Sequence, residues 1–263
     1  MLIYNIMNFS DLLNSPAFVI HVPELAPERG KLLNINLSNA GYTNINIFRG
    51  VNGIKPDEVE EALNIFGNPK FDIYCSKGNI GCNLSMLKVF KHIVDNKIPI
   101  ATIFEDDIVF HPEWSTIATK FYENTPKNFD ILYMGNQIEE CCVINNIPRI
   151  NKKSCFCMHA IVVTFKGANK LLNLVLNWNY KSNNAYKCMG RLATGITNCD
   201  IIIKNAQQLI IEKKINPNIL IWYCWNGTKN QCEYNKLPLI TNSSCRNTGL
   251  VFQNVNFSSL SKI

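Results

Sequence analysis

The stretch that decides the fold is Ile100–Phe104, which reads IATIF and is followed at once by Glu105, Asp106 and Asp107. A short, nearly continuous apolar run is typical of a strand that helices cover on both faces of a parallel sheet. In open α/β sheets, ligands bind beyond the carboxyl ends of the strands, and the three acids fall at such an end. The stretch therefore predicts a central strand that delivers an acidic cluster to a binding site.

Three adjacent carboxylates repel one another and lose hydration when buried, so the cluster requires a compensating partner. Mg²⁺ and Mn²⁺ bind carboxylate and phosphate oxygens, and a metal that bridges protein and diphosphate neutralises charge on a leaving group. If the extended geometry continued past Phe104, Glu105 and Asp107 would point to one side and Asp106 to the other. The alternative is an exposed acidic turn or a helix N-cap that leads into residues 108–114, and the triplet alone does not decide between these interpretations.

The flanking sequence alternates strand and helix patterns. Apolar runs predict strands, Pro27 and Pro56 open predicted helices, and helical spacing marks two further segments. The predicted strands are 17–22, 44–48, 100–104, 130–134, 160–165 and 208–211, and the predicted helices are 27–40, one from residue 56, 80–94 and 167–178. This alternation predicts an α/β fold with a mainly parallel central sheet flanked by helices. Without a repeat or a low-complexity linker, we expect a single domain over 1–263, less regular from about residue 225.

Composition narrows the class of protein. Hydrophobic residues make up 47% of the 263 residues and charged residues 17%, as in an ordinary globular protein. The net charge of +6 comes without a dense basic run, so nucleic-acid binding is not expected. We find no apolar run of membrane-spanning length and no basic leader with an apolar core, which predicts a cytoplasmic protein without a transmembrane segment.

Eleven cysteines are an odd number, and no CxxC pair occurs among them. Neither a disulfide framework nor a zinc ribbon is therefore indicated, and we expect mostly buried thiols. Cys141-Cys142 and the Cys155/Cys157 pair near His159 have spacings that match no common metal site, which favours a structural role for them.

The segments around the acidic triplet resemble glycosyltransferase family 25, which includes lipooligosaccharide galactosyltransferases and collagen hydroxylysine galactosyltransferases. The resemblance covers most of the chain, and its order and spacing both match. Its most specific pieces are Gly78–Ser85 and Ile103–Phe110, and the other pieces are Phe18–Ile20 with Glu28-Arg29, Ile47–Gly53, Phe129–Gly135, His159–Val163 and Gly167–Leu172.

This resemblance implies a GT-A type nucleotide-sugar-binding fold. It also implies an enzyme that transfers a hexose, galactose or else glucose, from a UDP-sugar to a hydroxyl of a glycan or of a hydroxylysine-type acceptor. Mn²⁺, or Mg²⁺, would be held by Asp107 together with Glu105. The donor would be contacted by Glu105, Asp106 and Ser85.

The β-linked products typical of the family imply inversion at the anomeric centre, which requires a base for the acceptor hydroxyl. Asp200 resembles a later family acid in its placement and is the first candidate, and His159 is the second. Glu139 and Glu140 are further candidates. The structural alternatives are a solvated loop for the two glutamates and a hydrogen-bonded strand-end residue for His159.

One departure from the family pattern concerns Met86, because the family commonly has Ser-His where this chain has Ser85-Met86. The departure raises the alternative of a catalytically degenerate protein that still binds a sugar or a nucleotide. The retained acidic triplet argues against complete degeneration. A third interpretation, metal-assisted phosphoester hydrolysis, leaves the Gly78–Ser85 and His159–Val163 segments unexplained.

Overall fold

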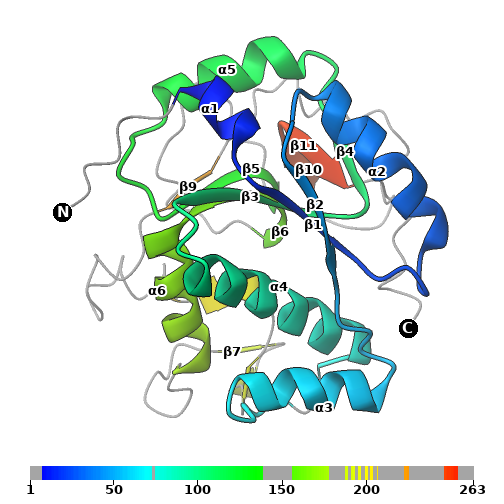
Figure 1. Cartoon of the computed structure of the whole chain (residues 1–263). Helices are drawn as coiled ribbons and strands as arrows, with labels where there is room; N and C mark the ends of the chain where they lie inside the picture. The colour runs from blue at the N-terminus through cyan, green and yellow to red at the C-terminus, as the bar shows by residue number, and fades with distance from the viewer. Residues whose placement is uncertain are drawn as a thin grey trace.

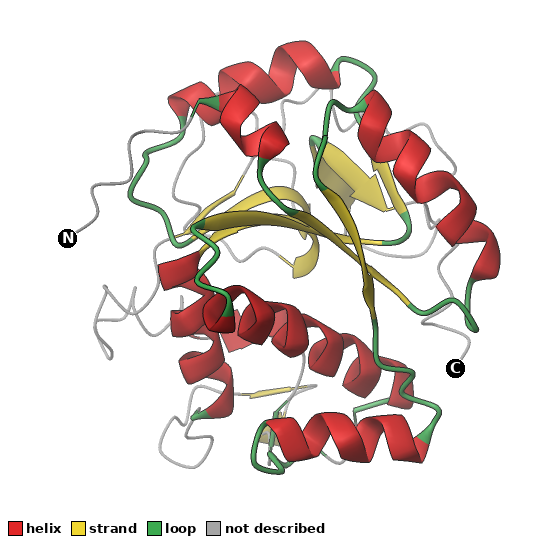
Figure 2. Cartoon of the chain, in the orientation of Figure 1, coloured by secondary structure: helices red, strands yellow, loops and turns green. Residues whose placement is uncertain are grey.

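The computed structural model describes residues 8–72, 75–138, 156–177, 187–188, 191–192, 195–196, 199–200, 202–203, 206, 222–224 and 246–253. Within them a central sheet lies between two layers of helices (Figure 1, Figure 2). The helices are α1 Phe9–Asn14, α2 Pro27–Asn39, α3 Pro56–Ile65, α4 Lys77–Asp95, α5 Trp114–Asn124 and α6 Phe165–Leu176. The strands are β1 Ala17–His21, β2 Ile45–Arg49, β3 Ile100–Glu105, β4 Ile108–Phe110, β5 Ile131–Ile138, β6 Phe156–Thr164, β7 Lys187–Cys188, β8 Arg191–Leu192, β9 Trp222–Cys224, β10 Arg246–Gly249 and β11 Val251–Gln253.

The main sheet has seven strands. Six of them follow the order β10-β5-β6-β3-β1-β2, and the seventh, β9, also pairs with β5. β1 is parallel to both β2 and β3, and β5 is parallel to β9. β6 is antiparallel to β3 and β5, and β10 is antiparallel to β5. Five of the seven strands thus run in one direction, which confirms the predicted α/β architecture with a mainly parallel sheet. The antiparallel insertion of β6 is a feature that the apolar run of that strand could not reveal.

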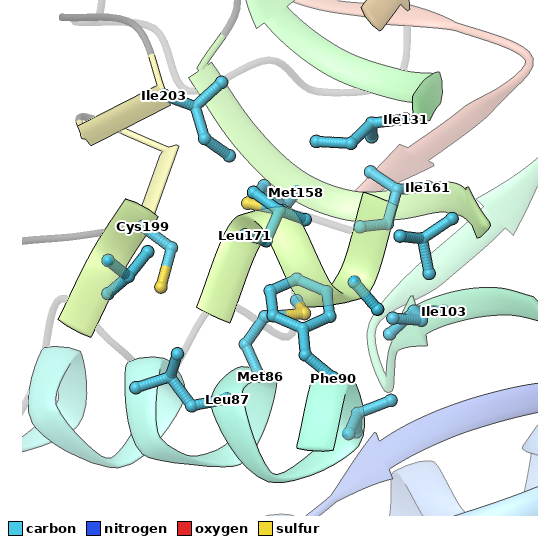
Figure 3. Close-up of a cluster of buried hydrophobic side chains, with 14 of the residues drawn as sticks. Met86, Leu87, Phe90, Ile103, Ile131, Met158, Ile161, Leu171, Cys199 and Ile203 are labelled. Carbon is cyan, nitrogen blue, oxygen red and sulfur yellow. The ribbon is translucent and has the colours of Figure 1, made fainter. Parts of the chain in front are cut away.

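β3 lies at the junction of two hydrophobic cores. Ala101 and Ile103 belong to the core beneath α4 and α6, whereas Ile100 and Phe104 belong to the core on the α1, α2 and α5 side. Figure 3 shows the first core, in which Phe90 of α4 packs near Ile103. Because successive strand side chains point to opposite faces, this strand contributes to both cores, and each fully buried large side chain stabilises the fold by about 1.5–3 kcal/mol.

Local signals set several boundaries. Pro27 stands in the first turn of α2, and Gly41 follows the helix in a left-handed conformation with φ 94°.

The predicted strand 208–211 lies outside the described residues. None of the helices in the described part of the chain combines the length and the apolar character that a membrane span requires.

The loop after β2 packs backbone to backbone against the first turns of α4. A Cβ atom on Gly53 would lie 1.8 Å from the carbonyl oxygen of Lys77, and one on Gly81 would lie 2.7 Å from the carbonyl oxygen of Val51. Only glycine permits so close an approach at either position. The two glycines therefore fix where this loop lies relative to α4.

We predict that Gly53→Ala lowers the free energy of unfolding by about 3 kcal/mol, because the clash is with backbone and no rotamer change relieves it. Gly67→Ala is the control, since Gly67 has φ 73° and no atom within 4 Å of an added Cβ. That substitution adds only conformational strain, which costs about 1 kcal/mol. Urea unfolding of both variants measures the difference, and equal losses would contradict the proposed backbone contact.

Candidate active site

A cleft of about 710 Å³, including space open to solvent, lies at the carboxyl ends of β1, β2 and β3. The loops after β1 and β2 form a largely apolar wall, the first turns of α4 form another wall, and the end of β3 supplies acids. Its lining residues are Ile20, Val22, Leu25, Ala26, Arg29, Val51, Gly53, Ile54, Gly78, Cys82, Ser85, Glu105, Asp106 and Asp107. Parallel strands bring their carboxyl ends to one edge, so the strand order itself creates this cleft.

Asp106 is held between two basic side chains. Nδ1 of His21 lies 2.6 Å from Oδ2 of Asp106, and Nη1 of Arg29 donates to Oδ1 at 2.6 Å. His21 ends β1 and Arg29 lies in the first turns of α2, so one strand-helix unit provides both partners. The His21 ring lies against Gly30, where a Cβ would come within 2.8 Å of its Nε2 atom. Both carboxylate oxygens of Asp106 are thus engaged by the protein.

The same guanidinium also faces Asp107. Nη1 of Arg29 lies 3.8 Å from Oδ2 of Asp107, and the Asp107 residue is 7% exposed. At this distance the interaction is a charge attraction and not a good hydrogen bond. Arg29 therefore compensates two of the three acids.

Glu105 faces α4 instead. Its Oε1 atom lies 4.0 Å from Sγ of Cys82, and its backbone is opposite Ile20 in the parallel pairing of β3 with β1. Residues 106 and 107 form a turn between β3 and β4. The expected alternation, with Glu105 and Asp107 on one side, is therefore not continued, and Asp106 and Asp107 share the cation of α2.

Ser85 lines the cleft from α4, and its hydroxyl makes two hydrogen bonds within the protein. Oγ donates to the carbonyl of Gly81 at 2.6 Å and accepts the N–H of Val51 at 2.7 Å. These bonds tie α4 to the loop after β2. The donor contact expected of Ser85 remains a prediction.

Asp200 lies close enough to the cleft to raise the pKa of Cys82, which lines it. Its Oδ2 atom accepts the backbone N–H of Cys157 at 2.9 Å. Burial raises the pKa of the Cys82 thiol well above its usual value, and the Glu105 and Asp200 carboxylates raise it further. Although Asp200 is not among the described residues that line the cleft, it belongs to the negative surroundings of Cys82. Its role as the base stays a prediction.

His159 is completely buried in β6, and its Nε2 atom lies 2.9 Å from the carbonyl oxygen of Val251. Burial lowers its pKa to about 4, so the ring is neutral at pH 7. His159 is not among the described residues that line the cleft. This geometry favours the structural interpretation of His159. The other two base candidates, Glu139 and Glu140, lie outside the described residues, as do Cys141, Cys142 and Cys155.

Met86 points away from the cleft. Its side chain is 3% exposed and belongs to the core between α4 and the sheet, beside Phe90 and Met158 (Figure 3). Cys82 and Ser85 face the cleft from the same helix. The difference from the family at residue 86 therefore changes a core position and not the lining of the cleft.

The donor atoms of the cleft suit a hard divalent cation, because they are carboxylate oxygens. In the described part of the chain, no three His, Cys, Asp or Glu side chains form a group that holds a metal by itself. Mg²⁺-type sites commonly use one or two carboxylates and complete the shell with substrate phosphates and water. Both oxygens of Asp106 are bound by His21 and Arg29. That Glu105 and Asp107 hold the cation stays a prediction.

No role for His21 or Arg29 was predicted from the sequence. His21 was part of the predicted strand 17–22, and Arg29 appeared only within a family motif. A polar residue at the carboxyl end of a strand next to β3 is the signal that could have identified His21. That signal requires the strand order, which brings β1 beside β3.

Comparison with known proteins gives a family. The model of "Glycosyltransferase family 25 (LPS biosynthesis protein)" matches residues 15–186. Human procollagen galactosyltransferase 2 is 27% identical in an alignment of 125 residues that covers 43% of this chain and 20% of that protein. The mouse protein of the same name is 24% identical in an alignment of 120 residues that covers 43% of this chain and 19% of that protein. The matched region therefore spans about a fifth of these relatives.

A solved structure, described as that of the inositol-1-phosphate CTP transferase from T. maritima, aligns over 95% of this chain and 96% of that chain. The sequence identity is 12% and the TM-score is 0.43. A TM-score of that size supports no argument, so the fold rests on the strand order given above.

We predict that Arg29→Met lowers the free energy of unfolding by about 3 kcal/mol, because it leaves buried carboxylates without their cation. The double variant Arg29→Met/Asp106→Asn should lose at least about 1 kcal/mol less than the sum of the single losses. Lys91→Met is the control, since Lys91 and Asp95 form an exposed pair, 41% and 53% exposed. Its loss should stay below about 1 kcal/mol. Strict additivity of the Arg29 and Asp106 losses in urea unfolding would rule out the coupling.

We also predict that Met86→His destabilises the protein by about 2 kcal/mol without raising activity, because it buries an imidazole in an apolar core. Met86→Leu should cost less than about 1.5 kcal/mol, since it keeps an apolar side chain of similar volume. Thermal unfolding and turnover of both variants test this. A gain of activity in Met86→His would instead support the idea that residue 86 limits catalysis.

Proposed function

The chain belongs to glycosyltransferase family 25, and on that basis we propose that it transfers a hexose from a UDP-sugar to a hydroxyl acceptor with inversion. The observation that carries the proposal is the cleft in which the three acids of the β3 end and Arg29 face one space. The relatives named procollagen galactosyltransferase 2 support galactose as the sugar. A glycan hydroxyl and a hydroxylysine-type hydroxyl are the acceptors that we propose.

The lining of the cleft combines apolar and charged side chains, which suit the base and the diphosphate of a nucleotide. Apolar side chains of the loops after β1 and β2, such as Val22, Leu25 and Ile54, offer a surface for a flat base. The charged part of the lining offers Arg29, a cation whose side chain is 9% exposed. In such a low-exposure site a fixed guanidinium stabilises charge that develops on a leaving diphosphate.

Asp107 and Glu105 would hold Mn²⁺ or Mg²⁺ together with donor phosphate oxygens. When bound, such a cation supplies Lewis-acid neutralisation of the leaving diphosphate. Asp106 contributes differently, because its bonds to His21 and Arg29 orient the guanidinium toward the same region.

Transfer with inversion also requires removal of the acceptor proton. We propose Asp200 as the base, because a carboxylate accepts a proton readily and its charge reaches the Cys82 side of the cleft. The backbone N–H of Cys157 binds one of its oxygens and orients the group. The acceptor hydroxyl would then approach from the side of the cleft opposite the leaving UDP.

We predict that UDP binds in a Mn²⁺-dependent manner and that Asp107→Asn reduces transfer at least about a hundredfold while the protein stays folded. Isothermal titration with UDP, CDP and GDP, each with and without Mn²⁺, measures the first part. Transfer assays with several UDP-hexoses measure the second part. The matched control is Asp95→Asn, which removes an exposed carboxylate at the far end of α4 and should leave binding and transfer unchanged.

The outcomes separate the competing functions. UDP binding that does not depend on a metal, or no nucleotide binding at all, would contradict the proposed site. Metal-dependent UDP binding without transfer or donor hydrolysis would favour the degenerate binding protein. The burial of Met86 in the core leaves that alternative without support from the lining of the cleft.

A further inference from the structure

β10 and β11 are consecutive strands that only Leu250 separates, and they pair with different sheets, so residues 246–253 join the main sheet to the strand that follows the acidic triplet. β10 pairs with β5, and β11 pairs with β4, so that Gln253 is opposite Ile108 and Val251 is opposite Phe110. Figure 1 shows this β10–β11 segment, drawn in red, alongside β4. The segment lies beyond residues 15–186, to which the family model is matched.

Backbone hydrogen bonds hold the β10–β11 segment on both sides. The N–H of Leu250 donates to the carbonyl of Met134 in β5 at 2.7 Å. The carbonyl of Leu250 accepts the N–H of His111, one residue after β4, at 2.9 Å. Leu250 and Val251 are fully buried. The β10–β11 segment therefore connects β5 to β4.

β4 begins at the residue that follows Asp107, so the pairing of β4 with β11 helps to determine where Asp107 lies. β4 is only three residues long, and it pairs with β11 in a two-stranded sheet separate from the main one. Ile108 is 4% exposed and packs in the same core as Val251. A shift of β11 would therefore move the backbone that carries the acid.

His159 is the side chain that holds β11 to the main sheet. A carbonyl oxygen only accepts, so the bond to Val251 places the ring proton of neutral His159 on Nε2. Gly135 of β5 makes room for this bond, because a Cβ there would lie 2.3 Å from Nε2 of His159 and 2.2 Å from the carbonyl oxygen of Val251. Residues of β5, β6 and β11 thus lie together around this one hydrogen bond.

We propose that His159 is a positioning residue for the transfer reaction and not its base: by binding Val251 it holds β11 against β4 and thereby fixes Asp107. The inference rests on the proposed function in one respect, that Asp107 serves the donor site. A base must reach the acceptor hydroxyl, whereas the His159 ring is fully buried and its N–H is directed at a backbone carbonyl.

Three variants of the whole chain test the proposal. His159→Leu removes the donor, Gly135→Ala inserts a methyl group into the same bond, and His159→Gln places an amide N–H where Nε2 lies. Hydrogen exchange of the ligand-free protein at residues 108–111 reports on β4, and UDP titration with Mn²⁺ reports on the donor site. We expect exchange to accelerate and UDP binding to weaken by about tenfold in His159→Leu and Gly135→Ala, the equivalent of one net hydrogen bond. His159→Gln should retain both properties within about threefold.

Val175→Ala is the control for lost core stability, because Val175 is fully buried in α6 on the other face of the sheet. It should leave exchange at residues 108–111 close to wild type. The proposal is overturned if His159→Leu leaves that exchange unchanged. It is also overturned if His159→Gln abolishes transfer and flattens one limb of the pH profile while exchange and UDP binding stay intact, since that pattern identifies a base. Exchange needs no donor, so a wild-type protein that fails to bind UDP would reject the proposed function while the effect of His159 on β4 still stands.

Discussion

Three consecutive carboxylates at the end of a buried strand are the constraint on which the rest of this structure depends. Such a cluster is stable only where cations and donors surround it. The parallel pairing of β1 with β3 places Ile20 opposite Glu105, so the next residue of β1, His21, reaches Asp106. The helix that follows β1 then brings Arg29 to the same acid. The arrangement of β1, β3 and α2 thus also places the basic partners that compensate the charge of the acidic motif.

The cleft exists because glycines let backbone segments approach where side chains would otherwise fill the space. Gly30 accommodates the His21 ring, and Gly53 and Gly81 bring the loop after β2 onto α4. Ser85 then closes this contact with two hydrogen bonds. The walls are consequently fixed by backbone contacts and a buried hydroxyl, which leaves the charged edge of β3 facing open space. A site of this kind is organised before any ligand binds, as electrostatic catalysis requires.

Much of the fold could be predicted because its signals are local. The apolar run of β3 and the Pro27 and Gly41 boundaries of α2 each need only a few neighbouring residues. α5 was missed, and its N-cap residue Glu113 makes no side-chain cap that a sequence would display. The antiparallel direction of β6 and the pairing of β11 with β4 depend on contacts distant along the chain. An apolar strand reads the same in either direction, so periodicity cannot decide such pairings.

The place of the acids at the end of a strand was predicted, but their separate contacts were not, and the reason is the turn within the triplet. An extended chain would have grouped Glu105 with Asp107, since side chains alternate along a strand. β3 instead ends at Glu105, which keeps that residue on the α4 side near Cys82. The turn then directs both Asp106 and Asp107 toward Arg29, which is close to the first and more distant from the second. Asp106 is thereby bound by His21 and Arg29, whereas Asp107 lies 3.8 Å from the same guanidinium. The three acids differ in their contacts because the strand ends between Glu105 and Asp106 and the chain then turns, and the three-residue motif alone does not contain that information.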